Sequence, residues 1–199
     1  SYTIDGLTID RGGENDVGLF GSSNGTIRNV GLINGSVTGK SNVGGIVGMN
    51  EGTVSYSHNT GSVSGDMNVG GVVGYNDRTV SYSYNAGGSV SGNTNVGGVV
   101  GLNYKYVSYS HNTGSVSGNT NVGGVIGYSC YGELNDAYNT GTVTGSGNYV
   151  GGVAGSSSNS CSNVYNTGSV SGSGDCVGGI MGRNGYGDLN NAYNTGSVS

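Results

Sequence analysis

The chain has 199 residues, of which 45 are glycine, and it contains no proline, no tryptophan and one phenylalanine. A single core packed from large side chains is therefore not expected. Only 9% of the residues are charged, the net charge is -5, and the six Lys and Arg residues are scattered, which argues against nucleic acid as a partner. Disorder is the alternative on composition alone, but disordered chains usually carry more charge and proline.

A repeat of 26 to 28 residues runs along the chain. Each unit opens on Val-Gly-Gly-apolar-apolar-Gly, with Leu19 replacing the second glycine in the first unit. The units start at Val17, Val43, Val69, Val96, Val122, Val150 and Val177, so successive starts differ by 26, 26, 27, 26, 28 and 27 residues. We expect residues 1–16 to form a partial leading coil or cap and residues 17–199 to form seven repeats.

Each unit offers short strands and no helix. In the second unit, β-branched residues between glycines predict strands over 45–49, 53–57 and 62–64. Glycine every few residues disfavours a helix by about 1 kcal/mol each, and no apolar stripe of helical period is present. The prediction is an all-β protein: a single elongated parallel β-solenoid with about three short strands per coil, right-handed by the usual crossover preference.

In such a solenoid, equivalent residues of successive coils stack in columns about 4.8 Å apart. Two columns are apolar and are expected to point inward: Val54, Val80, Val107, Leu134, Cys161 and Leu189, and Val63, Val90, Val116, Val143, Val170 and Val198. A third, of small residues, is expected to join them: Ser57, Ser83, Ser110, Ala137, Val164 and Ala192. Cys161 then fits as a small buried hydrophobe, and no essential disulfide framework is predicted.

The first unit carries a family resemblance. Residues 18–21 read Gly-Leu-Phe-Gly, residues 25–29 Gly-Thr-Ile-Arg-Asn and residues 35–39 Gly-Ser-Val-Thr-Gly. This resembles the GLUG repeat of large bacterial surface proteins, which include filamentous-haemagglutinin-like adhesins and the non-catalytic regions of IgA-specific metallopeptidases. The likeness extends through all seven units, although later units have Gly-Ile-Val-Gly or Gly-Val-Val-Gly.

The GLUG resemblance implies a non-catalytic module of a secreted or cell-surface bacterial protein. It would serve as an adhesin stalk or as a binding surface for glycans or sister rods, and the family supplies no catalytic residues. A fibre-forming structural unit, an ice-binding solenoid that uses Ser/Thr rows such as Ser62 and Ser64, and a carbohydrate-active β-helix enzyme remain the alternatives. No apolar run long enough to insert into a membrane is visible.

Chemistry at a defined site finds little support in the sequence. His58 and His111 share a column two coils apart, roughly 10 Å, which is too far for one metal ion. Glu51 and Asp77 share a loop column but form no carboxylate pair of a glycosidase. Asp66, Asn93 and Asn119 could line a corner, as an asparagine ladder or a weak calcium site. We predict no catalytic residue, no metal and no cofactor.

The 15 tyrosines are the main candidates for binding. One predicted outward column holds Tyr56, Tyr82 and Tyr109. A second holds Tyr84, Tyr138, Tyr165 and Tyr193, together with the two histidines. Two interpretations of these rings are open: they brace neighbouring coils by stacking on one another, or they form a ridge that binds glycans or another rod.

Overall fold

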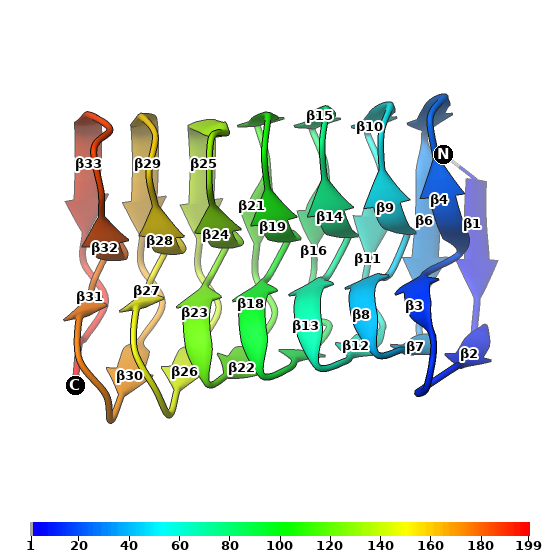
Figure 1. The fold of residues 1–199 in the computed structure, drawn as a ribbon, viewed down its shortest axis with the longest axis horizontal. Coiled ribbons are helices and arrows are strands. Elements are labelled where there is room, and N and C mark those ends of the chain that lie inside the picture. The colour runs from blue at the N-terminus through cyan, green and yellow to red at the C-terminus, as the bar shows by residue number, and fades with distance from the viewer. Residues whose placement is uncertain (1) are drawn as a thin grey trace.

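The structure is a computed structural model that describes residues 2–199, and it shows a rod of stacked parallel coils with its long axis along the repeat (Figure 1). All pairs between its strands are parallel, and each coil adds one rung to every sheet. The predicted fold class, an all-β parallel solenoid, is confirmed. No helix that could cross a membrane occurs among residues 2–199.

Four sheets, here called A to D, run the length of the rod. Sheet A consists of β1 (Tyr2–Asp5), β5 (Thr26–Arg28), β6 (Val30–Ile33), β10 (Thr53–Ser55), β11 (His58–Asn59), β15 (Thr79–Ser81), β16 (Tyr84–Asn85), β20 (Tyr106–Ser108), β21 (His111–Asn112), β25 (Glu133–Asn139), β29 (Cys161–Asn166) and β33 (Leu189–Asn194). Sheet B consists of β2 (Thr8–Asp10), β7 (Ser36–Thr38), β12 (Ser62–Ser64), β17 (Val90–Ser91), β22 (Val116–Gly118), β26 (Val143–Gly145) and β30 (Val170–Gly172).

The other two sheets are made by the Val-Gly-Gly segments and the strands next to them. Sheet C consists of β3 (Asn15–Val17), β8 (Ser41–Gly44), β13 (Met67–Gly70), β18 (Thr94–Gly97), β23 (Thr120–Gly123), β27 (Val150–Gly151) and β31 (Val177–Gly178). Sheet D consists of β4 (Phe20–Ser23), β9 (Val47–Asn50), β14 (Val73–Asn76), β19 (Val100–Asn103), β24 (Ile126–Ser129), β28 (Ala154–Ser157) and β32 (Met181–Asn184).

The three strands predicted for the second unit are present as β9, β10 and β12, and the structure adds β8 and β11 to that coil. Strand β8 contains the Val43-Gly44 landmark itself. In the last three coils the two halves of sheet A join into one strand each, β25, β29 and β33. At the other end, β1 and β2 pair with β6 and β7, so the leading residues form part of a coil.

The predicted inward columns form the core. Strand register pairs Val54 with Val80 and Val63 with Val90, and the valines of the middle coils are completely or almost completely buried. Cys161 is buried between Leu134 and Leu189, as expected for a small hydrophobe. At the small-residue positions Ser57, Ser83, Ser110 and Ala137 are also buried, whereas in the last coil Ala192 is partly buried and Leu189 and Val198 are exposed. The core is therefore a set of thin, repeated layers that hold few large side chains.

Glycine is required where sheets C and D turn back on each other. A methyl group at Gly44 would lie 2.8 Å from the backbone nitrogen of Gly74 and 2.8 Å from the carbonyl oxygen of Val72, both in the next coil. A methyl group at Gly45 would lie 2.5 Å from the carbonyl oxygen of Gly71. The regular recurrence of the glycine pairs along the repeat therefore reflects close backbone approach.

Candidate binding surfaces

An interior ladder of asparagines fixes the turn that follows sheet A. The amide of Asn112 donates to the side-chain oxygen of Asn139 at 2.8 Å and to the carbonyl of Gly114 at 2.7 Å, while its own oxygen accepts from the Gly114 N–H. The same arrangement repeats in successive coils. Its members are Asn59, Asn85, Asn112, Asn139, Asn166 and Asn194.

The residue before each of these asparagines points outward and carries an aromatic ring. Neighbouring rings are 4.6 to 5.0 Å apart between centroids and are inclined by only 3° to 7°. We call this stack the six-ring ladder; it consists of His58, Tyr84, His111, Tyr138, Tyr165 and Tyr193. The predicted column is therefore a continuous ring stack.

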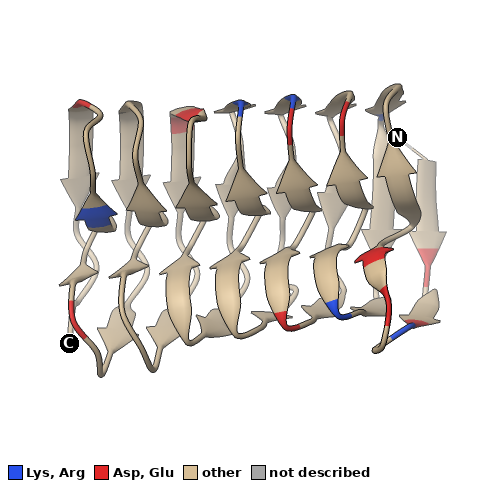
Figure 2. Ribbon diagram, in the orientation of Figure 1, with Lys and Arg blue, Asp and Glu red and all other residues tan. Residues whose placement is uncertain are grey.

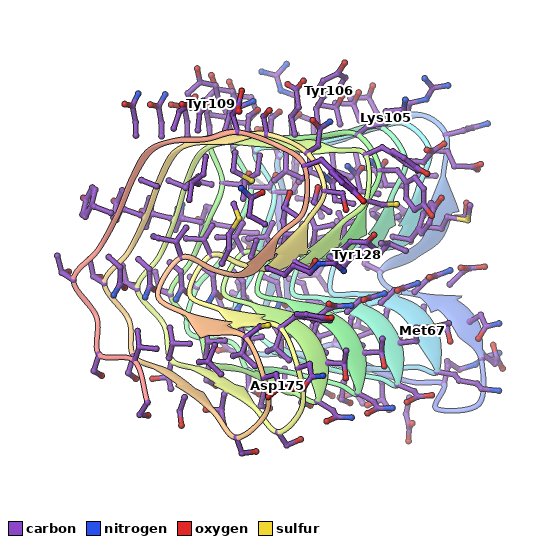
Figure 3. The ribbon with its side chains drawn as sticks, turned by 60° about the vertical axis from the view of Figure 1, so that its left-hand side comes forward. Met67, Lys105, Tyr106, Tyr109, Tyr128 and Asp175 are labelled. Atoms are coloured by element: carbon purple, nitrogen blue, oxygen red, sulfur yellow. The ribbon has the colours of Figure 1, made fainter. Side chains whose placement is uncertain are left out.

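The second predicted column is also stacked. Tyr56, Tyr82 and Tyr109, here the three-ring ladder, have ring centroids 4.7 Å apart at both steps. Arg28 covers the free face of Tyr56 at 5.0 Å from the centroid. Asp136 lies next in the column, and its negative charge raises the pKa of Tyr109. Figure 3 shows Tyr109 projecting along one border of the rod with Tyr106 and Lys105.

The backbone of the three-ring ladder is strained. Tyr56, Tyr82 and Tyr109 have φ of 51°, 50° and 49°, in the left-handed region that bulky residues rarely adopt. Asn29 and Asn163 have the same conformation in this column, and asparagine tolerates it far better. The stacking of the tyrosines offsets part of this cost.

The geometry limits what both ladders can contact. Because neighbouring rings are almost parallel and their centroids are at most 5.0 Å apart, each inner ring covers the faces of its neighbours. Only ring edges and phenolic hydroxyls are open to solvent, at the spacing of the strands. A sugar therefore cannot stack on the faces of the inner rings. Burial lowers the pKa of His58 and of His111, so both imidazoles are neutral members of the stack at neutral pH.

A third group of tyrosines was not predicted. Tyr75 and Tyr104 have centroids 5.4 Å apart with planes inclined by 36°, and Tyr104 and Tyr131 are 5.8 Å apart at 50°. They lie on strand β14 and in the loops after β19 and β24. The repeat itself does not require tyrosine at these positions, and that departure from the pattern is the sequence signal that could have revealed the group.

The residues considered as metal ligands do not lie close together. Among residues 2–199 no group of three or more His, Cys, Asp or Glu side chains is placed to hold a metal ion. Asp66, Asn93 and Asn119 line up through backbone hydrogen bonds of 2.9 and 3.1 Å. The side-chain ladder of this region runs through a neighbouring column instead, which includes Asn68, Asn95 and Asn121.

Charged residues lie mainly at the turns and are sparse over the sheets (Figure 2). Glu51 and Asp77 follow β9 and β14 at equivalent positions in adjacent coils. Arg11 and Glu14 form an exposed ion pair near the start of the chain.

The three cysteines are free, and burial raises the pKa of the Cys161 thiol to about 11.

These features define a parallel β-solenoid repeat protein whose outer surface carries periodic aromatic rows. No protein-family model matches the chain, and no solved structure matches it. A segment of 55 residues is 47% identical to part of halomucin from Haloquadratum walsbyi. The match covers 27% of this chain and 1% of halomucin, so this chain is similar to a very small part of that protein.

Proposed function

We propose that this chain is a non-catalytic repeat module, of the GLUG kind, in a secreted or cell-surface protein, where it forms a rod that contacts neighbouring rods through the six-ring ladder. The observation that carries the proposal is the continuous ring stack with a step of 4.6 to 5.0 Å. The similarity to a segment of halomucin supports the surface location.

The spacing of the ladder favours another rod as its partner. The open ring edges and hydroxyls repeat at the distance between strands, about 4.8 Å. A second solenoid has the same rise per coil, so its own row can remain in register with the ladder along the whole rod. Each coil then adds a weak contact, and the contacts together give useful affinity because they are linked.

The chemistry of the row suits such pairing. Tyr193, at the end of the six-ring ladder, is 54% exposed and the other members are half-buried, so the tyrosine rings combine an apolar edge with a hydroxyl at water. Few charges lie over the sheets to repel a second copy (Figure 2). Glycans remain the second candidate partner, but the ladder offers them hydroxyls and edges and no open ring faces.

The test replaces Tyr138, Tyr165 and Tyr193 together by Ser and leaves the valine columns untouched. The variant should remain a folded β-solenoid by circular dichroism but should lose concentration-dependent association in sedimentation velocity. Tyr186→Ser, at a position that is 93% exposed and outside both ladders, is the matched control. If the folded triple variant associates as well as the wild type, or if the wild type is monomeric at all accessible concentrations, pairing through this ladder is wrong.

A further inference from the structure

The outward row of sheet D changes its chemistry along the rod. In coil order, strand register aligns Ser22, Met49, Tyr75, Leu102, Tyr128, Ser156 and Arg183. The four members in the middle are apolar or aromatic, and polar residues stand on both sides of them. The buried positions of the same strands keep their chemistry instead: one row is Val47, Val73, Val100 and Ile126, and another is the hydrogen-bonded series Asn50, Asn76, Asn103 and Ser129. The outward segment is therefore a bounded patch and not a consequence of the repeat.

Two loop tyrosines extend this patch. Tyr104 follows β19 and Tyr131 follows β24, and the tilts of 36° and 50° along the series Tyr75, Tyr104 and Tyr131 leave ring faces partly open. Tyr131 is 70% exposed. In the ladders, by contrast, the parallel rings cover one another. We call Tyr75, Tyr104, Tyr128 and Tyr131, with Met49 and Leu102 beside them, the tyrosine patch.

Acidic groups border the patch on one side. Glu51 and Asp77 lie in the turns that follow β9 and β14, where Figure 2 shows the red segments at the upper rim. Both carboxylates are close enough to Tyr75 to add to the rise of its pKa, which burial causes first. The phenol of Tyr75 therefore stays protonated and can donate a hydrogen bond. Lys105 projects at the same rim (Figure 3).

We propose that the tyrosine patch binds an extended neutral sugar chain. A hexose offers an apolar face of C–H groups to an open aromatic ring and a rim of hydroxyls that donate to carboxylates such as Glu51 and Asp77. The four middle coils span three strand spacings, roughly 14 Å, so the patch accommodates a short stretch of chain. No enclosed pocket is present among residues 2–199, which suits a flat, extended ligand better than a small molecule.

The charges around the tyrosine patch determine which polysaccharides it can bind. The rim of the patch carries both signs, because Glu51 and Asp77 lie near Arg78 and Lys105 (Figure 2), so it has no net positive charge that would attract an anionic glycan, and the net charge of -5 of the whole chain opposes one. The inference does not depend on rod pairing, because the tyrosine patch and the six-ring ladder share no residue. The two proposals can therefore fail separately.

The experiment is affinity electrophoresis of the full chain in gels that contain hydroxyethylcellulose or glucomannan, with dextran sulfate as an anionic probe. The wild type should be retarded by at least one neutral polymer and not by dextran sulfate. Replacing Tyr104 and Tyr131 together by Ser should weaken the retardation about tenfold, as expected for the loss of roughly 1.4 kcal/mol of binding free energy. Tyr186→Ser is the matched control, because Tyr186 is 93% exposed in an equivalent loop outside the patch.

Both tyrosines lie in loops, so the double variant should melt as the wild type does, and circular dichroism verifies this. The proposal is overturned if neither neutral polymer retards the wild type, or if the folded double variant is retarded equally. It is also overturned if the double variant changes only the association of the rods in sedimentation, because the patch would then be a protein interface.

Discussion

The interior asparagine ladder and the six-ring ladder are built from adjacent residues, yet they follow different rules. All six inward positions are asparagine, whereas two of the outward positions are histidine and four are tyrosine. Inside, Asn85 must donate to the Asn112 oxygen and to the Gly88 carbonyl at the same time. Outside, the neighbouring coil requires only a flat ring at about 5 Å, so His111 fits between Tyr84 and Tyr138.

This difference between the two ladders shows which side of the turn contributes most to the stability of the rod. A buried amide in the ladder has several polar partners that would be left unsatisfied without it, and unsatisfied buried groups are costly. An outward ring contributes stacking that a different ring can replace. Stability is therefore concentrated on the inner side of the turn, and the outer side is free to vary for binding.

The largest expected effect is that of Asn112→Leu. The substitution removes one hydrogen bond each from Asn85 and Asn139 and both side-chain hydrogen bonds of the Gly114 backbone, all in a buried turn. We expect a loss of roughly 3 to 6 kcal/mol in the free energy of unfolding, measured by denaturant titration. Asn119→Leu, at an exposed position, is the control and should change stability little. Equal effects of the two substitutions would contradict the inner-side argument.

A smaller effect is expected on the outer side. Tyr165→Ser removes the stacking of ring 165 on Tyr138 and on Tyr193. We expect it to lower the free energy of unfolding by about 1 to 3 kcal/mol. Tyr165→His should retain most of that stability, because histidine occupies the same column at position 111. The measurement is again denaturant titration. If Tyr165→His is as destabilising as Tyr165→Ser, ring identity matters more than the stack suggests.

A pH dependence should distinguish the two histidines from the tyrosines. Burial lowers the pKa of His58 and His111 in the folded state, so below pH 6.5 the unfolded chain binds more protons than the folded one. Their contribution is complete above about pH 6.5 and is lost as the pH falls through the lowered pKa. We expect the melting temperature to fall by a few degrees between pH 7.5 and 5, and His58→Tyr with His111→Tyr to remove most of that fall.

The smallest expected effect concerns the buried thiol. Cys161→Val places the commonest residue of its column in a core position and should change stability by less than about 1.5 kcal/mol. In the wild type, alkylation followed by mass spectrometry should label exposed Cys176 rapidly and Cys161 only after denaturation. Rapid labelling of Cys161 in the folded protein would show that its column opens.

Much of the fold follows from the sequence alone. The 26- to 28-residue period aligned Val54 with Val80 and Val63 with Val90 without any structure, because a stacked solenoid pairs residues that are one period apart. The same alignment placed Tyr84 between His58 and His111 and put Cys161 into an apolar column. These predictions depended only on register, which a regular repeat specifies.

The packing of sheets against each other and the backbone conformation at the corners do not follow from the register of the repeat, and only the tertiary structure shows them. The folding of sheets C and D against each other depends on backbone contacts such as that between Gly44 and the next coil, so β8 was not recognised as a strand. The left-handed conformation of Tyr56, Tyr82 and Tyr109 is likewise imposed by the shape of the corner. Whether rings lie parallel or tilted follows from these corners and loops, and that geometry separates the closed faces of the ladders from the open faces of the tyrosine patch.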